Sequence, residues 1–178
     1  MLVANETVAS YMFWQDLPFL YRIHETPDLE RIEKLSHIIQ GFGLYIKGNH
    51  EEIHPKEIQK VLAGIAGRNE EGLVTRLALR SMMQAKYSTE CLGHFGLAVK
   101  EYTHFTSPIR RYPDLQIHRI LKERIRGKLD DKRVEHYRSI LDKVAKDTSK
   151  LERRAEEAER ETDKLKKCQY MEDKIGQL

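Results

Sequence analysis

The stretch HFTSPIRRYPDLQIHR, His104–Arg119, places two adjacent arginines between two prolines and directly ahead of a helical pattern. Pro113 would break a helix that ran through it, so the sequence predicts a helix that starts at Pro113 and ends near Arg126. Arg110 and Arg111 then lie on the approach to a helix N-terminus. Free backbone N–H groups and guanidinium groups converge there, and phosphate is the anion that this arrangement favours.

The local charge supports an anion site. Residues 104–128 contain seven basic and two acidic residues, whereas the whole chain carries a formal net charge of only +3. A basic binding surface must therefore be local. Arg110 and Arg111 could instead pair with internal carboxylates and join a strand to a helix, and this alternative stays open. Three tyrosines could stack on the bases of a single strand or pack in the core: Tyr87, Tyr102 and Tyr112.

The composition is typical of one globular, strongly charged domain. The chain has 178 residues, of which 40% are hydrophobic and 33% charged, which favours solvated helices. Its two cysteines, Cys91 and Cys168, form no Cys-x-x-Cys pattern, so we expect neither a disulfide framework nor a zinc knuckle, and a reducing, cytoplasmic setting. No signal peptide and no apolar run of about 18 residues are present, so no membrane span is predicted.

The apolar periodicity predicts an α+β fold that is mostly helical, with two or three short strands. Strands are expected over 19–24 and 96–105. Helices are expected over the following residues, the first of them buried: 1–14, 26–40, 55–65, 70–86, 113–126 and 134 onward.

The last third of the chain has an apolar or small residue at heptad-like spacing, which could indicate a coiled coil. However, Ser149-Lys150-Leu151-Glu152 matches a capping box, which predicts a break near Asp147 and a new helix after it. In the second half the spaced positions are mainly Ala and Thr, so we expect this half to pack against the body of the chain.

The sequence contains no strong candidate for a metal site. HEEIH, residues 50–54, has the spacing of a zinc-protease motif, which requires a helix. Pro55 follows at once and disfavours helical backbone at His54, so we expect a loop in which His54 caps a helix that starts at Pro55. The acidic residues do not form the tight cluster that a two-metal nuclease centre needs.

The segment HFGLAVKEYTHFTSPIRRYPDLQIHR, with MMQAKYS before it and RRAEEAERE after it, resembles the signature of the ribonuclease II and ribonuclease R family. LVANETVA and IKGNHEEIHPKEIQKVL resemble its ribonuclease R branch in Gram-positive bacteria. Members are processive exoribonucleases that digest single-stranded RNA from the 3′ end to nucleoside 5′-monophosphates. The resemblance covers the whole chain. It implies that residues 1–178 are one partial domain, the C-terminal half of the RNB catalytic domain, without the cold-shock domains, aspartate cluster and S1 domain.

The resemblance also implies functional residues. Arg110 would be the catalytic arginine that contacts the phosphate to be cleaved and stabilises charge in the transition state. The remaining expected RNA-binding residues are Ser107, Arg111, His104, Arg119 and Glu159. The family's aspartates would hold Mg²⁺ in the complete enzyme, so we expect no metal on this chain and no activity from it alone.

We expect single-stranded RNA as the partner and no binding to a membrane. The parent enzyme is expected to be monomeric. Exposed apolar surface around residues 1–14 could let the chain self-associate. Two other functions stay open: a freestanding RNA-binding module or pseudo-enzyme, and a structural domain whose helices from Val134 onward dimerise.

Overall fold

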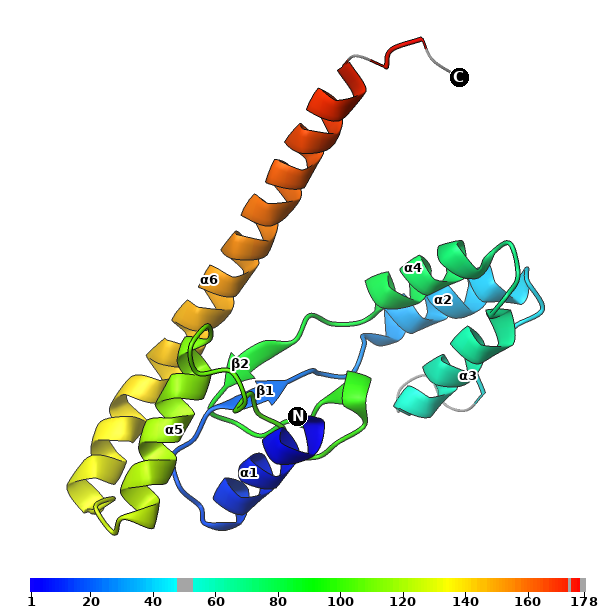
Figure 1. Ribbon diagram of the computed structural model, residues 1–178. Helices are drawn as coiled ribbons and strands as arrows, with labels where there is room; N and C mark the ends of the chain where they lie inside the picture. Colours follow the sequence, from blue (N-terminus) through cyan, green and yellow to red (C-terminus); the bar gives the residue numbers. More distant parts are fainter. Residues whose placement is uncertain (48–52, 173, 177–178) are drawn as a thin grey trace.

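The computed structural model describes residues 1–47, 53–172 and 174–176. It confirms a mostly helical α+β fold, in which α2, α3 and α4 lie on one side of a small sheet and α5 with the start of α6 on the other (Figure 1). The elements are, in order, α1 (Leu2–Trp14), β1 (Tyr21–Ile23), α2 (Leu29–Gln40), α3 (Pro55–Ile65), α4 (Glu71–Ser81), β2 (Lys86–Ser88), the 3₁₀ helix η2 (Phe95–Leu97), α5 (Tyr112–Ile125) and α6 (Asp131–Glu172).

The two strands pair antiparallel, with Tyr21 opposite Ser88 and Ile23 opposite Lys86. The strand predicted over 19–24 is confirmed in a shorter form, whereas the one predicted over 96–105 is wrong. The chain turns through η2 there, because the Gly96 N–H donates to His24 Nδ1 at 3.0 Å. A Cβ at Gly96 would lie 2.8 Å from that nitrogen, so this close approach requires glycine.

Two separate apolar clusters hold the molecule together. One joins α1, the sheet, α5 and the first part of α6; its fully buried members include Met12, Phe19, Leu20, Ile117 and Leu141. The other joins α2, α3, α4 and η2 through residues such as Ile32, Ile39, Ile58, Ile65 and Val74. The prediction that the first helix is buried is wrong for most of its surface, because only Asn5, Ala9 and Met12 are buried. The exposed apolar surface expected around residues 1–14 is present, and Trp14 is 75% exposed.

The helix boundaries depend on local capping. As predicted, α3 begins at Pro55 and His54 caps it, accepting a hydrogen bond from the Lys56 N–H at 3.2 Å. Residues 50–52 of HEEIH lie outside the described residues. The second predicted helix begins three residues late, after Asp28, and the helix predicted over 70–86 ends at Ser81, because residues 86–88 pair in the sheet.

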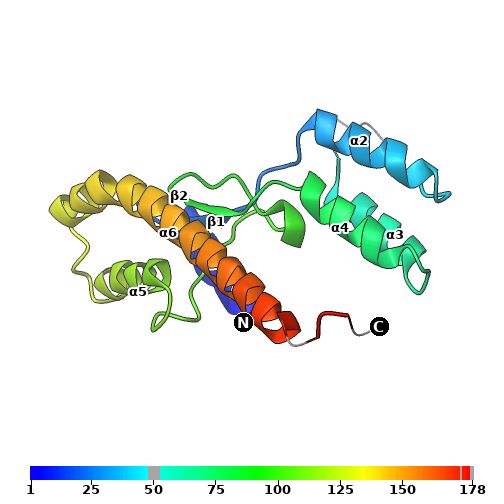
Figure 2. The same ribbon diagram turned by 90° about the horizontal axis from the view of Figure 1, so that it is seen from above.

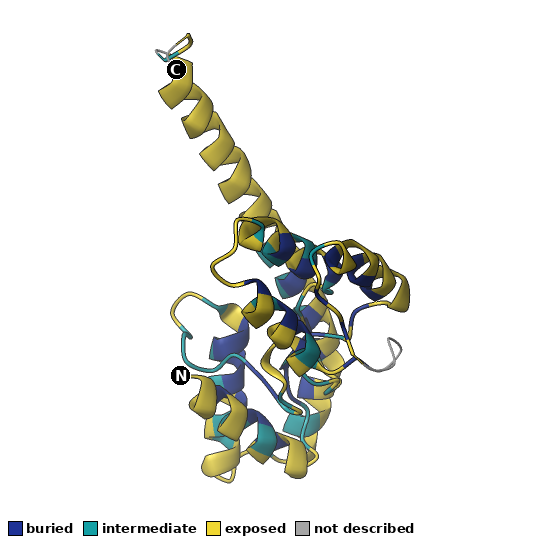
Figure 3. Ribbon diagram, turned by 90° about the vertical axis from the view of Figure 1, so that its right-hand side faces the viewer, coloured by how far each residue is buried: buried dark blue, intermediate teal, exposed yellow. Residues whose placement is uncertain are grey.

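Helix α6 is continuous from Asp131 to Glu172, so the predicted break near Asp147 is wrong. Ser149 Oγ donates to the Ala145 carbonyl at 2.8 Å and accepts from the Tyr87 N–H at 2.9 Å, which makes it a helix-interior residue tied to β2. Figure 3 shows the end of α6 projecting from the body, and its residues there are exposed. The prediction that this half packs against the body is therefore also wrong.

Side chains also join α5 to α6. Arg133 donates to both carboxylate oxygens of Glu123, at 2.9 and 2.8 Å, and the Tyr137 hydroxyl donates to Glu123 Oε1 at 2.9 Å. The hydrogen bonds from Arg133, followed by the one from Tyr137, lower the pKa of Glu123.

Stability from the charged form of Glu123 is expected above the glutamate pKa of an unfolded chain, about 4.3, and is lost as the pH falls through the lowered folded value. Glu123→Gln should therefore lower the Tm at pH 7, modestly because the pair is partly exposed, and the difference from wild type should shrink at pH 3. Thermal unfolding followed by circular dichroism measures both values. An equal difference at the two pH values would exclude a contribution from the charge.

Candidate nucleic-acid interface

A tight turn carries the two arginines into α5. The Ser107 carbonyl accepts hydrogen bonds from the Arg110 N–H at 3.3 Å and the Arg111 N–H at 3.1 Å. Arg111 is the N-cap of α5, and Pro113 lies in the first turn, where a missing N–H has no cost. The expectation that both arginines lie on the approach to this helix is confirmed.

The two arginines have different surroundings. Arg111 donates from Nη2 and Nε to Asp114 Oδ2, at 2.8 and 3.2 Å, and the Ser107 N–H donates to the same oxygen at 2.8 Å. The Asp114 side chain is 0% exposed. Arg111 therefore pairs with an internal carboxylate, as one of the two alternatives expected, and an RNA contact by Arg111 stays a prediction. The Arg110 side chain is exposed and makes no ion pair within the described part of the chain.

Arg110 lines a cavity of about 400 Å³ between the turn and α6. Seen from above, α6 crosses next to β1 and β2, which brings its middle turns to this place (Figure 2). The cavity unites three of the predicted site residues, Arg110, Arg111 and Glu159. Its other lining residues are Tyr87, Tyr112, Pro113, Thr148, Leu151, Glu152, Ala155 and Glu156.

The α6 wall of the cavity carries carboxylates. Glu152 is paired with Arg22, and Glu156 accepts a hydrogen bond from Gln84 Nε2 at 3.4 Å. An anion in the cavity would therefore be held at the arginine wall. The carboxylates opposite accept hydrogen bonds and can bind hydroxyl groups, such as those of a sugar.

The other predicted residues lie around the cavity rather than in it. Ser107 forms the base of the turn. His104 lies behind it, where its Nδ1 is 2.8 Å from the Tyr87 hydroxyl oxygen. Arg119 is exposed on α5, 3.5 Å from Gln116 Oε1, and does not line the cavity. RNA contacts by these three residues stay predictions.

The partners that shape the site were not among the residues predicted from the sequence. Asp114 was detectable, because an acid three residues after Arg111 in the first helical turn is placed to pair with it. The pairing of Glu152 with Arg22, and the bond between Tyr87 and His104, join residues distant in sequence and leave no local pattern.

The described residues do not fit a Mg²⁺ site. Among residues 1–47, 53–172 and 174–176, no group of three or more His, Cys, Asp or Glu side chains could hold a metal ion. Over the same residues, no helix is both long and apolar enough to cross a membrane.

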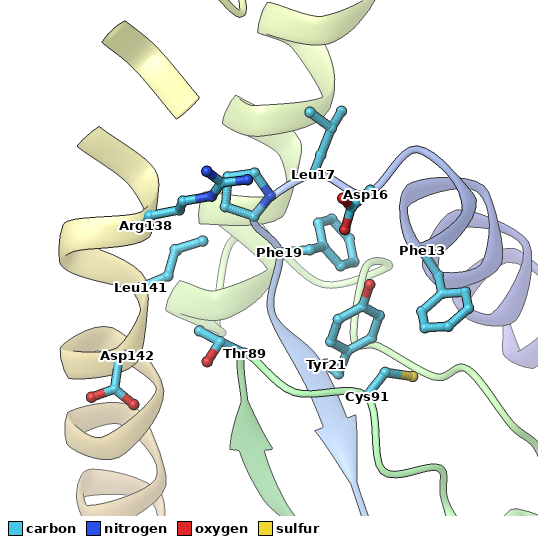
Figure 4. A pocket seen from close by; sticks show the side chains of 11 residues that line it. Phe13, Asp16, Leu17, Phe19, Tyr21, Thr89, Cys91, Arg138, Leu141 and Asp142 are labelled. Atoms are coloured by element: carbon cyan, nitrogen blue, oxygen red, sulfur yellow. The ribbon is translucent and has the colours of Figure 1, made fainter. Parts of the chain in front are cut away.

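A second cavity, of about 390 Å³, lies between the end of α1 and α6 (Figure 4). Phe13, Phe19 and Tyr21 give it an aromatic wall next to the first apolar cluster. None of the predicted site residues lines it, so it is separate from the arginine cavity.

An exposed arginine beside a helix N-terminus, opposite groups that can bind hydroxyls, is typical of a protein that binds sugar-phosphate chains. The RNB domain family model matches residues 1–127, and the chain belongs to this family. The resemblance noted in the sequence is confirmed.

The relatives are ribonucleases. Ribonuclease R of Aquifex aeolicus is 47% identical over 99% of this chain, and ribonuclease R 1 of Lactococcus lactis is 44% identical over 99%. This chain spans only 25% and 22% of their respective lengths.

Solved structures of related proteins are also similar to this chain. RNase R of Mycoplasma genitalium, in complex with ribose methylated single-stranded RNA, has a TM-score of 0.92 and 28% identity over 98% of this chain and 28% of that one. Yeast Ssd1, a pseudonuclease, has a TM-score of 0.59 and 28% identity over 68% of this chain and 15% of that one.

Proposed function

We propose that this chain is part of a processive 3′-to-5′ exoribonuclease that hydrolyses single-stranded RNA to nucleoside 5′-monophosphates. It supplies two parts of that enzyme: the arginine that contacts the phosphate, and part of the wall of the RNA channel. One observation supports this proposal most. Arg110 is exposed, makes no ion pair among the described residues, and lines one cavity with Arg111 and Glu159. Similarity to an RNase R solved in complex with single-stranded RNA supports the choice of ligand.

In this proposal each residue has a separate task. Arg110 donates hydrogen bonds to the phosphate and becomes more effective as negative charge builds up in the transition state. Arg111, fixed by Asp114, holds the turn at the start of α5. Glu159 accepts hydrogen bonds from ribose hydroxyls. Mg²⁺ would activate the attacking water in the complete enzyme, where residues outside this chain hold it.

The proposal includes a monomeric enzyme in a reducing cytoplasm. Both cysteines are free: Cys91 is half-buried and Cys168 is exposed. Their state suits such a setting, because a stable exposed thiol needs reducing conditions.

The isolated chain is expected to be inactive, because an arginine cannot position the nucleophilic water or hold a metal. Labelled poly(A) incubated with the chain and Mg²⁺ should keep its length on a denaturing gel. Stepwise shortening that is abolished by Arg110→Ala would contradict the view that this chain lacks half of the catalytic centre.

An RNA-binding module or pseudo-enzyme is a second candidate, favoured by the similarity to the pseudonuclease Ssd1. Binding to oligo(A) should then be tight at low salt and fall steeply as salt is added, with a slope of log K against log salt of about −0.7 for each phosphate contact. A complete protein that binds in this way but never shortens RNA would favour this candidate over the nuclease.

A further inference from the structure

We propose that Tyr87 and His104 are positioning residues, whose hydrogen bond fixes the segment that carries Arg110 relative to α6. This inference rests on the proposed function, because it assigns the residues a role at the same phosphate site. Neither residue needs to touch the RNA for this role.

Tyr87 lies between the two walls of the arginine cavity. Its N–H donates to Ser149 Oγ on α6 at 2.9 Å, and its hydroxyl is 2.8 Å from His104 Nδ1. The Arg22 guanidinium lies over its ring, 4.7 Å from the centroid, and also pairs with Glu152 of α6. Tyr87 is therefore fixed to the α6 wall, and its hydroxyl is the group that reaches toward the arginine segment.

His104 is fixed on the opposite side. It precedes the Ser107 turn, and its ring lies edge-on to Tyr102 at 5.9 Å between centroids. Asn5 of α1 donates to the Tyr102 hydroxyl at 3.0 Å and accepts from the Phe105 N–H at 3.1 Å. Segment 102–105 is thus held to α1, and the bond from His104 to Tyr87 connects it to β2 and α6.

Both members of the pair are neutral near pH 7, because the pKa of His104 is lowered and that of Tyr87 is raised. Burial, followed by the positive charges of Arg111 and Arg22, lowers the pKa of His104 to about 3. Burial raises the pKa of Tyr87 to about 12. The hydrogen bond therefore does not change with pH near neutrality, and His104 adds no cation that would compete with Arg110 for phosphate.

Small displacements matter at such a site. If a catalytic group is misplaced by about 1 Å, the rate can fall about 100-fold. A hydrogen bond that sets the separation of the two cavity walls therefore affects how well Arg110 reaches a phosphate that also contacts α6.

The test is a mutant cycle on RNA binding by this chain, read by fluorescence anisotropy with oligo(A). Tyr87→Phe and His104→Leu each remove the bond and should weaken binding about fivefold, the worth of one hydrogen bond. His104→Asn keeps a polar group near the position of Nδ1 and should recover part of the affinity that His104→Leu loses. In an Arg110→Ala background, Tyr87→Phe should have no further effect.

The outcomes separate the two proposals. If Arg110→Ala weakens binding but Tyr87→Phe does not, or if Tyr87→Phe weakens it equally in both backgrounds, the positioning role is wrong and the proposed function stands. If Arg110→Ala itself has no effect, the arginine site fails, and this inference fails with it.

A second measurement needs no RNA. In ¹H–¹⁵N spectra of the free chain, Tyr87→Phe should shift the amide signals of Ser107, Ile109, Arg110 and Arg111, while its Tm stays close to that of wild type. Unchanged signals in that segment would show that the hydroxyl does not position the turn.

Discussion

Replacing Arg110 with alanine in a complete RNB-family nuclease that carries this segment is expected to lower kcat on oligoadenylate by about 10²–10³-fold. Removing one preorganised donor to a developing negative charge has an effect of this size. Arg110 can act in this way because its guanidinium lines the cavity and makes no ion pair within the described ranges. Steady-state kinetics on a labelled oligonucleotide separates kcat from KM.

Two variants sharpen the test. Arg126→Ala removes another exposed arginine, the C-cap at the far end of α5, and should leave kcat unchanged. Arg110→Lys keeps the charge but loses the two-pronged geometry, so it should restore only part of the rate. A rise in KM with unchanged kcat for Arg110→Ala would place the arginine on substrate binding and not on the transition state.

The features that the sequence predicted correctly depend on neighbouring residues. A proline at a first helical turn, at Pro55 or Pro113, fixes a helix start because its ring restricts the backbone and its missing N–H has no cost there. His54 as a cap follows from the same local pattern. The turn before α5 could thus be located without knowing the rest of the fold.

The wrong predictions concern residues whose partners are distant in sequence. Ser149 looked like a helix cap, but its hydroxyl accepts a bond from Tyr87, 62 residues away, and α6 continues through it. Gly96 looked like part of a strand, but its N–H donates a hydrogen bond to His24 Nδ1, 72 residues away. Local propensity loses to such tertiary contacts, and single-sequence patterns do not contain them.

The sequence predicted where the candidate site lies, but it did not predict how the two arginines differ in their surroundings. Arg110 and Arg111 are adjacent and chemically identical, so the sequence could support anion binding or internal pairing for both. The structure assigns internal pairing to Arg111 because the backbone turn points it toward buried Asp114. Arg110 leaves the same turn and lines the cavity, so anion binding stays a prediction for Arg110.

This division makes Asp114 the residue whose loss should damage the fold of the site most. Its carboxylate is completely buried and accepts three hydrogen bonds, two from Arg111 and one from the Ser107 N–H. Asp114→Ala leaves the Arg111 side chain, which is only 20% exposed, without its partner. Breaking a buried pair in this way is expected to lower the free energy of unfolding by about 3 kcal/mol.

Urea unfolding of this chain measures that loss, and Asp142→Ala is the matched control. Asp142 also lies on a helix and pairs with a cation, Lys146, but both side chains are exposed, so its loss should cost less than about 1 kcal/mol. Asp114→Ala should also weaken oligo(A) binding, because Ser107 and Arg111 no longer hold the turn from which Arg110 extends. Equal, small losses of stability in the two variants would mean that Asp114 does not organise the turn, and Arg110 would then need another source of rigidity.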